Sequence, residues 1–167
     1  MKQTFFIIEG KEVDRLVKSS MRRYQLYLIK EKIAIHYNGR ERLFYNLFSD
    51  HTKTDDGQPL KEILQKQVDF ITLPISKWMI ENQLYAALQR NKSFQYKDGV
   101  FYIENGNLSS ASLMMKDDYL YIEADGYYDA ESIFFEIIRK HEPSFLAIDI
   151  ENDRFGWLKP IKERNFV

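Results

Sequence analysis

Two dipeptides in the middle of the chain, Asp98-Gly99 and Asn105-Gly106, constrain the fold more than any other feature of the sequence. Both favour two-residue β-hairpin turns, because the central positions of such turns require a positive φ that Asn, Asp and Gly adopt at low cost. Asp117-Asp118 marks a weaker third turn. The turns separate four strand-like segments, which predicts an antiparallel meander of strands at 94–97, 100–104, 108–116 and 119–124.

Helical periodicity precedes the meander. In residues 31–49, apolar side chains recur at intervals of three and four residues, which is typical of one face of a helix. Asn38-Gly39 interrupts this pattern, and Gly inside a helix costs about 1 kcal/mol relative to Ala. The two halves are therefore expected to be kinked or separate. The apolar residues of this face are Ile33, Tyr37, Phe44, Leu47 and Phe48.

Three more helices are expected, beginning at Pro59, after Pro74 and at Asp129. Asp129 is read as an N-cap, and Glu131 as a carboxylate that balances the dipole of the first turn. Further strands are predicted at 24–30, 145–150 and 154–158. The sequence thus predicts an α+β fold, a single domain with an antiparallel β-meander and about four helices.

Composition narrows the range of functions. The 167 residues contain 24 Lys and Arg against 25 Asp and Glu, so the net charge is −1 and lacks the basic excess common among nucleic-acid-binding proteins. There are no cysteines, which excludes disulfides and thiolate metal sites and fits a reducing cytoplasm. No apolar run approaches the length needed to span a bilayer. We expect a cytoplasmic protein with no direct nucleic-acid or membrane contact.

The search for catalytic chemistry gives weak candidates. His36, His51 and His141 have no partner at metal-ligand spacing, so no metal site is predicted. The acidic string Glu123, Asp125, Asp129 and Glu131 allows acid–base chemistry in principle. Turn formation, capping and dipole balance explain the last three carboxylates more simply. We expect no enzyme and no cofactor.

Two other features leave alternatives open. The basic residues between 22 and 42 could form a nucleic-acid patch, although interleaved Glu31 and Glu41 favour a solvated margin. Gln67 lies within the apolar stripe of the helix that begins at Pro59. Its amide is either hydrogen-bonded to nearby backbone or placed on a face that is open to a partner. The stripe comprises Leu60, Ile63, Leu64, Val68 and Ile71.

From about Met21 to Val167, the chain resembles the sporulation inhibitor of replication (SirA) family of endospore-forming bacilli. The similarity is densest in three blocks of sequence. They are Tyr27–Glu31 with His36–Glu41, then Ile71–Ile75, and the C-terminal third with Gly156-Trp157-Leu158 and Lys162–Val167.

The resemblance implies a non-enzymatic inhibitor that binds the N-terminal domain of the replication initiator DnaA and prevents new rounds of initiation during sporulation. By position, the binding surface of the family falls on Ile33, Tyr37 and Gln67. Tyr37 and Gln67 match the family pattern, whereas Ile33 is an aliphatic residue where an aromatic one occurs. The resemblance implies no small-molecule substrate.

Periodicity and resemblance disagree about two of these residues. The helical stripe assigns Ile33 and Tyr37 to the core, whereas the resemblance exposes them. We favour the exposed interpretation, because Gln67 also interrupts an apolar stripe. The alternative function is a small-molecule sensor with a pocket between the meander and its helices.

The resemblance also divides the chain. Residues 1–20 form an N-terminal extension that the family pattern does not need, and 21–167 form a single domain. The extension is interpreted as an extra helix, a tail or the product of an over-long start-site assignment.

Overall fold

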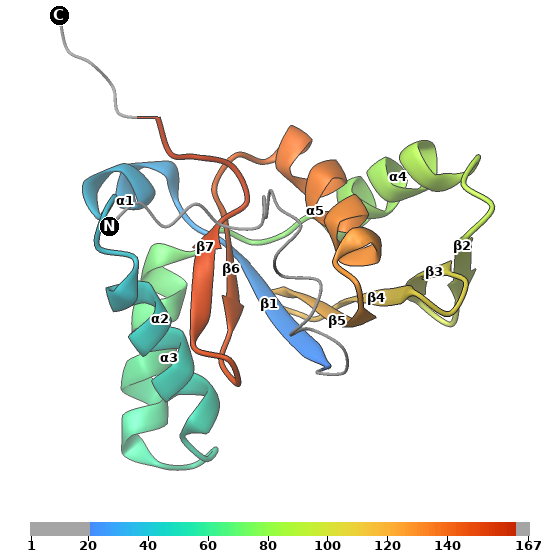
Figure 1. Ribbon diagram of the computed structural model, residues 1–167. Helices are drawn as coiled ribbons and strands as arrows, with labels where there is room; N and C mark the ends of the chain where they lie inside the picture. The colour runs from blue at the N-terminus through green and yellow to red at the C-terminus, as the bar shows by residue number, and fades with distance from the viewer. Residues whose placement is uncertain (1–20, 163–167) are drawn as a thin grey trace, which may run out of the picture.

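A seven-stranded antiparallel sheet runs through the protein in the order β2-β3-β4-β5-β1-β6-β7 (Figure 1). The computed structural model describes residues 21–162, so the predicted extension and the last five residues of the C-terminal motif lie outside the described part. The first strand of the described residues, β1, lies between β5 and β6 in the sheet. The strands are β1 (Arg22–Leu28), β2 (Phe94–Lys97), β3 (Val100–Asn105), β4 (Ser109–Met115), β5 (Leu120–Gly126), β6 (Phe145–Asp149) and β7 (Arg154–Trp157).

The predicted meander is confirmed as β2 to β5, with one difference in turn chemistry. Asp98 and Gly99 both have positive φ, 53° and 81°, as a two-residue turn requires. Asn105, in contrast, pairs with Ser109 within the ladder, so the expected two-residue turn at Asn105-Gly106 is wrong. The connection there is a three-residue loop, 106–108, in which Gly106 supplies the positive φ.

The predicted helices are present, and the first is divided in two. The chain leaves the helical path after Tyr37, and Gly39 adopts a φ of 84°, which favours glycine. The interruption that Asn38-Gly39 predicted is therefore a full break. The described residues form five helices, α1 (Glu31–His36), α2 (Arg42–Lys53), α3 (Pro59–Ile71), α4 (Lys77–Leu88) and α5 (Asp129–His141).

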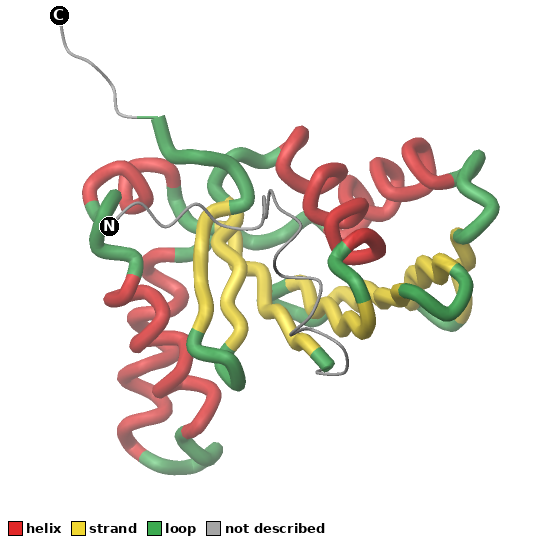
Figure 2. Tube along the Cα trace, in the orientation of Figure 1, coloured by secondary structure: helices red, strands yellow, loops and turns green. Residues whose placement is uncertain are grey.

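The helices cover both faces of the sheet (Figure 2). Alternate side chains of β1 face opposite sides, as the period of two in a strand requires. Tyr24 and Leu26 pack into a core with α4 and α5, whereas Tyr27 packs into a second core with α2 and α3. A central strand thus contributes to two hydrophobic cores, and the group formed by α1, α2 and α3 lies apart from α4 and α5 (Figure 1).

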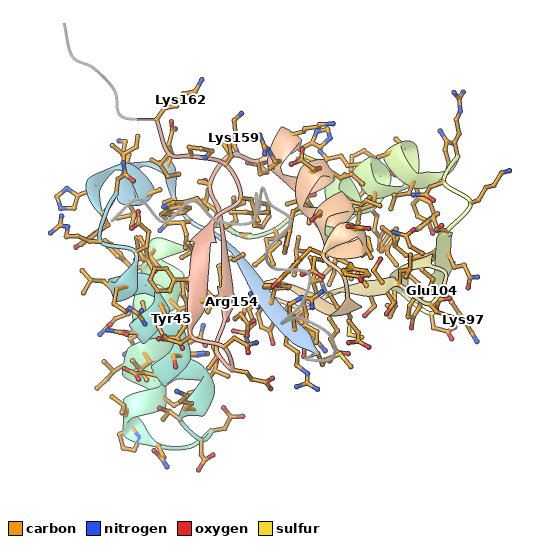
Figure 3. All side chains as sticks on the ribbon, in the orientation of Figure 1. Tyr45, Lys97, Glu104, Arg154, Lys159 and Lys162 are labelled. Carbon is orange, nitrogen blue, oxygen red and sulfur yellow. The ribbon has the colours of Figure 1, made fainter. Side chains whose placement is uncertain are left out.

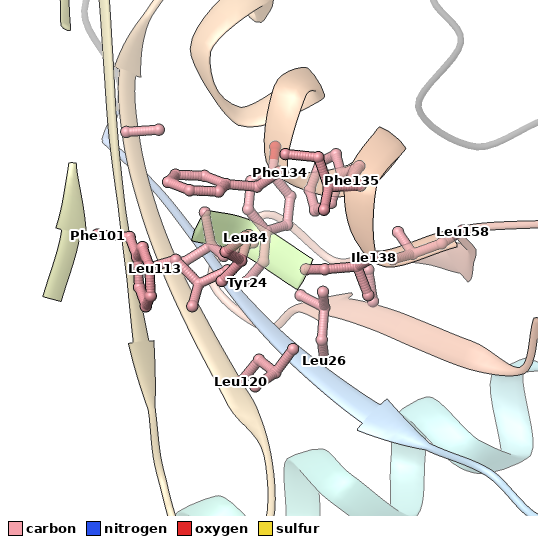
Figure 4. Packing of buried hydrophobic residues seen from close by; sticks show 14 of the residues in the cluster. Tyr24, Leu26, Leu84, Phe101, Leu113, Leu120, Phe134, Phe135, Ile138 and Leu158 are labelled. Atoms are coloured by element: carbon pink, nitrogen blue, oxygen red, sulfur yellow. The ribbon is translucent and has the colours of Figure 1, made fainter. Parts of the chain in front are cut away.

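The space between the meander and its helices is filled by core side chains. Phe101 and Leu113 of the sheet, Leu84 of α4 and Phe134 of α5 are all fully buried there (Figure 4). This is the place where the small-molecule sensor alternative expected a pocket. The packed contacts give that alternative no support.

The structure corrects the roles of three charged residues. Asp129 is already helical, and the residue before it, Tyr128, occupies the cap position without a side-chain cap hydrogen bond, so the N-cap assignment of Asp129 is wrong. Glu131 is fully buried and accepts hydrogen bonds from Arg22 Nε at 2.8 Å and Nη2 at 2.6 Å. Arg22 therefore belongs to the interior and not to a solvated basic margin, and Glu131 is an ion-pair partner.

Candidate partner-binding site

An apolar groove lies where α1, α2 and α3 meet. Its volume is about 610 Å³, and most of its lining is aliphatic or aromatic. We call it the α1–α3 groove. Its lining residues are Ile33 and Tyr37 at α1, Leu43, Phe44 and Leu47 of α2, and Ile63, Lys66, Gln67, Phe70 and Ile71 of α3.

Backbone hydrogen bonds anchor one wall of the groove to the sheet. The amide of Lys30 donates to the carbonyl of Ile71 at 2.9 Å, and the amide of Leu73 donates to the carbonyl of Leu28 at 2.8 Å. The C-terminal end of α3 is therefore held against the end of β1, from which α1 begins. This arrangement brings the start of α1 next to the C-terminal end of α3, beside the groove.

All three residues that the sequence places in the binding surface line this groove. Ile33 and Tyr37 are half-buried, with one side packed against the second core and the other facing the groove. Gln67 is exposed, and no hydrogen bond to its amide occurs among residues 21–162. Periodicity assigned Ile33 and Tyr37 to the core, and the family resemblance assigned them to the surface. Both residues are partly buried, because each borders the core and the groove.

Fewer residues of the apolar stripe on α3 are buried than the sequence predicted. Leu64, Val68 and Ile71 are buried, whereas Leu60 and Ile63 are more than half exposed. The core face and the groove face of this helix lie side by side. Gln67 belongs to the groove face, which explains a polar residue among apolar neighbours.

Sequence reasoning missed three exposed apolar residues of the groove. Leu43 is 51% exposed, Ile63 53% and Phe70 68%. A signal for Phe70 was present, because Ile63, Gln67 and Phe70 follow one another at spacings of four and three residues. These spacings define a second face of the helix beside the buried one. Leu43 carries no such signal, since the break before α2 decides which way it faces.

Cations lie close to two of the three aromatic rings in the groove lining, those of Tyr37 and Phe70. The Arg40 guanidinium lies 4.9 Å from the centre of the Tyr37 ring and donates a hydrogen bond to the carbonyl of His36 at 3.0 Å. The Lys30 ammonium lies 5.3 Å from the centre of the Phe70 ring. Both distances are within the range of cation–π contacts. Lys66 adds a third positive charge to the lining.

The groove has the character of a binding surface. Its lining contains one charged residue, Lys66, and no carboxylate or histidine. Within residues 21–162, no cluster of three His, Cys, Asp or Glu side chains is arranged to hold a metal ion. An apolar groove of this kind gains free energy by burying apolar groups of another molecule.

Polar clusters elsewhere stabilise the fold. Arg154 of β7 forms an ion pair with the buried carboxylate of Asp149 at 2.8 Å, and Asn152 donates to the same carboxylate. Tyr45 of α2 donates to the carbonyl of Ile150 at 3.2 Å and so joins α2 to the turn between β6 and β7. Figure 3 labels both Arg154 and Tyr45.

Over the described residues, no helix is both long enough and apolar enough to cross a membrane.

Comparisons with known proteins agree on one family. The family model described as "Sporulation inhibitor of replication protein SirA" matches residues 22–162. The chain is also 41% identical over 147 residues to a Bacillus subtilis (strain 168) protein named "Sporulation inhibitor of replication protein SirA". That match covers 87% of this chain and 99% of the relative. The chain therefore belongs to the SirA family.

Proposed function

We propose that this protein inhibits the initiation of DNA replication at the onset of sporulation, and that it does so in the cytoplasm by binding the N-terminal domain of the initiator DnaA. The name of the Bacillus subtilis relative supports the first part, since that protein is described as a sporulation inhibitor of replication. The choice of DnaA as the partner rests on the residues that resemble the binding surface of the family.

One observation supports the proposal most strongly. Ile33, Tyr37 and Gln67 come from two separate segments of the chain, yet all three line the α1–α3 groove. The family resemblance assigns them to one surface, and their common place at an apolar groove supports a shared role in binding.

The composition of the groove fits a protein partner. Exposed Leu43, Ile63 and Phe70 form an apolar surface next to the polar tips of Tyr37 and Gln67. Protein interfaces combine a buried apolar centre with polar groups that fix orientation. Binding would place an apolar projection of DnaA between α1 and α3.

Inhibition then follows from occupancy. A DnaA molecule whose N-terminal domain is covered by a 20.0 kDa protein cannot use the same surface for assembly at the origin. The groove contributes no reacting group to this mechanism. Inhibition by occupancy should scale with the amount of inhibitor relative to DnaA. This requirement distinguishes inhibition by occupancy from inhibition by an enzyme, which would act at low amounts.

A titration of the purified protein with the N-terminal domain of DnaA from the same organism tests the proposal. We expect saturable binding, and we expect induction of the protein in growing cells to lower the ratio of origin to terminus DNA. A pull-down from a sporulating lysate should retain DnaA. Absence of binding to the isolated domain, or a metabolite copurifying in its place, would contradict the proposal.

A further inference from the structure

We infer that the surface which docks in the α1–α3 groove carries an apolar projection bordered by carboxylates, and that Lys66, Arg40 and Lys30 recognise those carboxylates. This inference rests on the proposed function and adds the charge of the partner surface. It concerns three cations that the resemblance does not place in the binding surface.

Lys66 is the most direct element of the inference. It is exposed on α3, lines the groove between Ile63 and Phe70, and is the one charged residue of the lining. No carboxylate of the described chain lies within ion-pair distance of its ammonium group. Glu62 precedes it by one helical turn, a spacing at which Glu and Lys often pair, and does not do so here.

Arg40 and Lys30 extend the positive charge along both walls of the groove. Arg40 stacks over the ring of Tyr37 on the α1 side, and Lys30 lies over the ring of Phe70 on the α3 side. Arg40 donates a hydrogen bond to the backbone carbonyl of His36, and Lys30 donates one to the backbone carbonyl of Phe70. Neither cation forms an ion pair with a described carboxylate, so both keep their charge available to a partner.

Two carboxylates near the groove bond to other groups of the chain and not to these cations. Glu41 accepts hydrogen bonds from the Gly39 amide at 2.7 Å and from Trp157 Nε1 at 3.1 Å. Asp69 accepts a hydrogen bond from the side chain of Gln65 at 2.8 Å. Neither of these carboxylates forms an ion pair with Lys30, Arg40 or Lys66, so the three cations can pair with carboxylates of a partner, although the whole chain has a net charge of −1.

Cations that the described residues leave unpaired beside an apolar groove favour partners that carry carboxylates around an apolar contact. Complementary charges at the edge of an interface mainly raise the association rate and suppress wrong partners. Their effect weakens with salt, because screening acts over about 8 Å at physiological ionic strength. Charge complementarity would thus supply selectivity that an apolar groove alone lacks.

Charge reversal at the groove tests the inference. The N-terminal domain of DnaA is titrated with the full-length protein, Lys66→Glu, Lys66→Met, Arg40→Glu and the matched control Lys92→Glu, which lies in the loop between α4 and β2. We expect Lys66→Glu and Arg40→Glu to weaken binding on the order of tenfold, mainly through slower association. Lys66→Met should lose less, and Lys92→Glu should bind normally. Urea unfolding of each variant verifies that it is folded.

Two further measurements complete the test. The affinity of the unmodified protein should fall as salt is raised, and a DnaA variant with one carboxylate changed to Lys should restore binding to Lys66→Glu. If binding is strong but unaffected by salt and by both reversals, the inference is wrong while the proposed function stands. If the unmodified protein does not bind DnaA at all, the proposed function fails and this inference fails with it.

Discussion

At the scale of single residues, the ion pair of Arg22 and Glu131 shows what sequence patterns could not reveal. The two residues are 109 positions apart, and each has a plausible surface role when only its neighbours are considered. Tyr24 completes the cluster by donating its hydroxyl to Glu131 Oε1 at 2.8 Å. Local signals describe caps and solvated faces, whereas this pairing depends on β1 and α5 meeting in the folded chain.

The cluster predicts that a small chemical change at Glu131 greatly lowers the free energy of unfolding. Glu131→Gln keeps the shape of the side chain but leaves Arg22 charged and without its buried counterion. Breaking one partner of a buried ion pair costs about 3–5 kcal/mol, so urea unfolding should show a loss of that size. Glu123→Gln is the control, because Glu123 pairs with Arg23 at the surface. Equal losses in the two variants would contradict the account of the buried pair.

At the scale of elements, most of the fold could be predicted and the groove could not. The meander, the later strands and the helix positions follow from turn residues and periodicity. Asn38-Gly39 also indicated where the first helix is interrupted. The angle between α1 and α2 has no sequence signature, and that angle decides whether Leu43 and Tyr37 share a groove. Only the family resemblance indicated Ile33 and Tyr37 as binding residues.

The break between α1 and α2 makes a prediction of its own. Gly39 has a φ of 84°, and an L-residue in that region costs about 1–2 kcal/mol, so Gly39→Ala should lower the free energy of unfolding by that amount. Because the strain can reorient α1, binding of DnaA by the folded variant should weaken as well. Gly57→Ala is a matched control with a φ of 89° in the α2–α3 loop, away from the groove lining. It should lose similar stability and bind normally. If both variants bind DnaA normally, the break between α1 and α2 does not determine the shape of the groove.

At the scale of the whole molecule, two cores on opposite faces of one sheet bury several tyrosines. Burial raises the pKa of Tyr24 and Tyr27 above the usual value of 10.0, and burial raises the pKa of Tyr121 to about 12. A buried acid with a raised pKa stabilises the fold fully below its unfolded pKa and loses that contribution as the pH rises through the folded value.

The free energy of unfolding should therefore fall as the pH rises above about 10, where tyrosines of the unfolded chain ionise. Urea unfolding between neutral and alkaline pH measures the trend. Tyr27→Phe, which removes one ionisable group from the second core, should make the fall less steep. A free energy that rises over this range would contradict the assigned environments.

The boundary of the domain gives another prediction for the whole molecule. A chain that begins at Met21 should keep the melting temperature and the DnaA affinity of the full chain, because the match to the SirA family begins at residue 22. Thermal unfolding and the DnaA titration check this directly. A lower melting temperature would mean that residues 1–20 contribute to the stability of the domain.

The central claim is that the α1–α3 groove binds the partner, and Tyr37→Ala tests it most directly. Tyr37 faces the groove and touches the core on one side only. Its removal should therefore weaken DnaA binding by about 2 kcal/mol or more, the range of interface hot spots. The substitution should lower the free energy of unfolding by less than about 3–5 kcal/mol, the loss when a core aromatic residue is truncated to Ala. Gln67→Ala should weaken binding by about 1 kcal/mol, the worth of one hydrogen bond.

The comparison needs binding and urea unfolding measured on the same purified proteins. Tyr96→Ala serves as the control, because Tyr96 is an exposed tyrosine of β2 that packs on Phe101 far from the groove in sequence and in the sheet. The account predicts weaker DnaA binding by Tyr37→Ala and unchanged binding by Tyr96→Ala. A Tyr37→Ala protein that unfolds early yet binds DnaA normally when folded would contradict it.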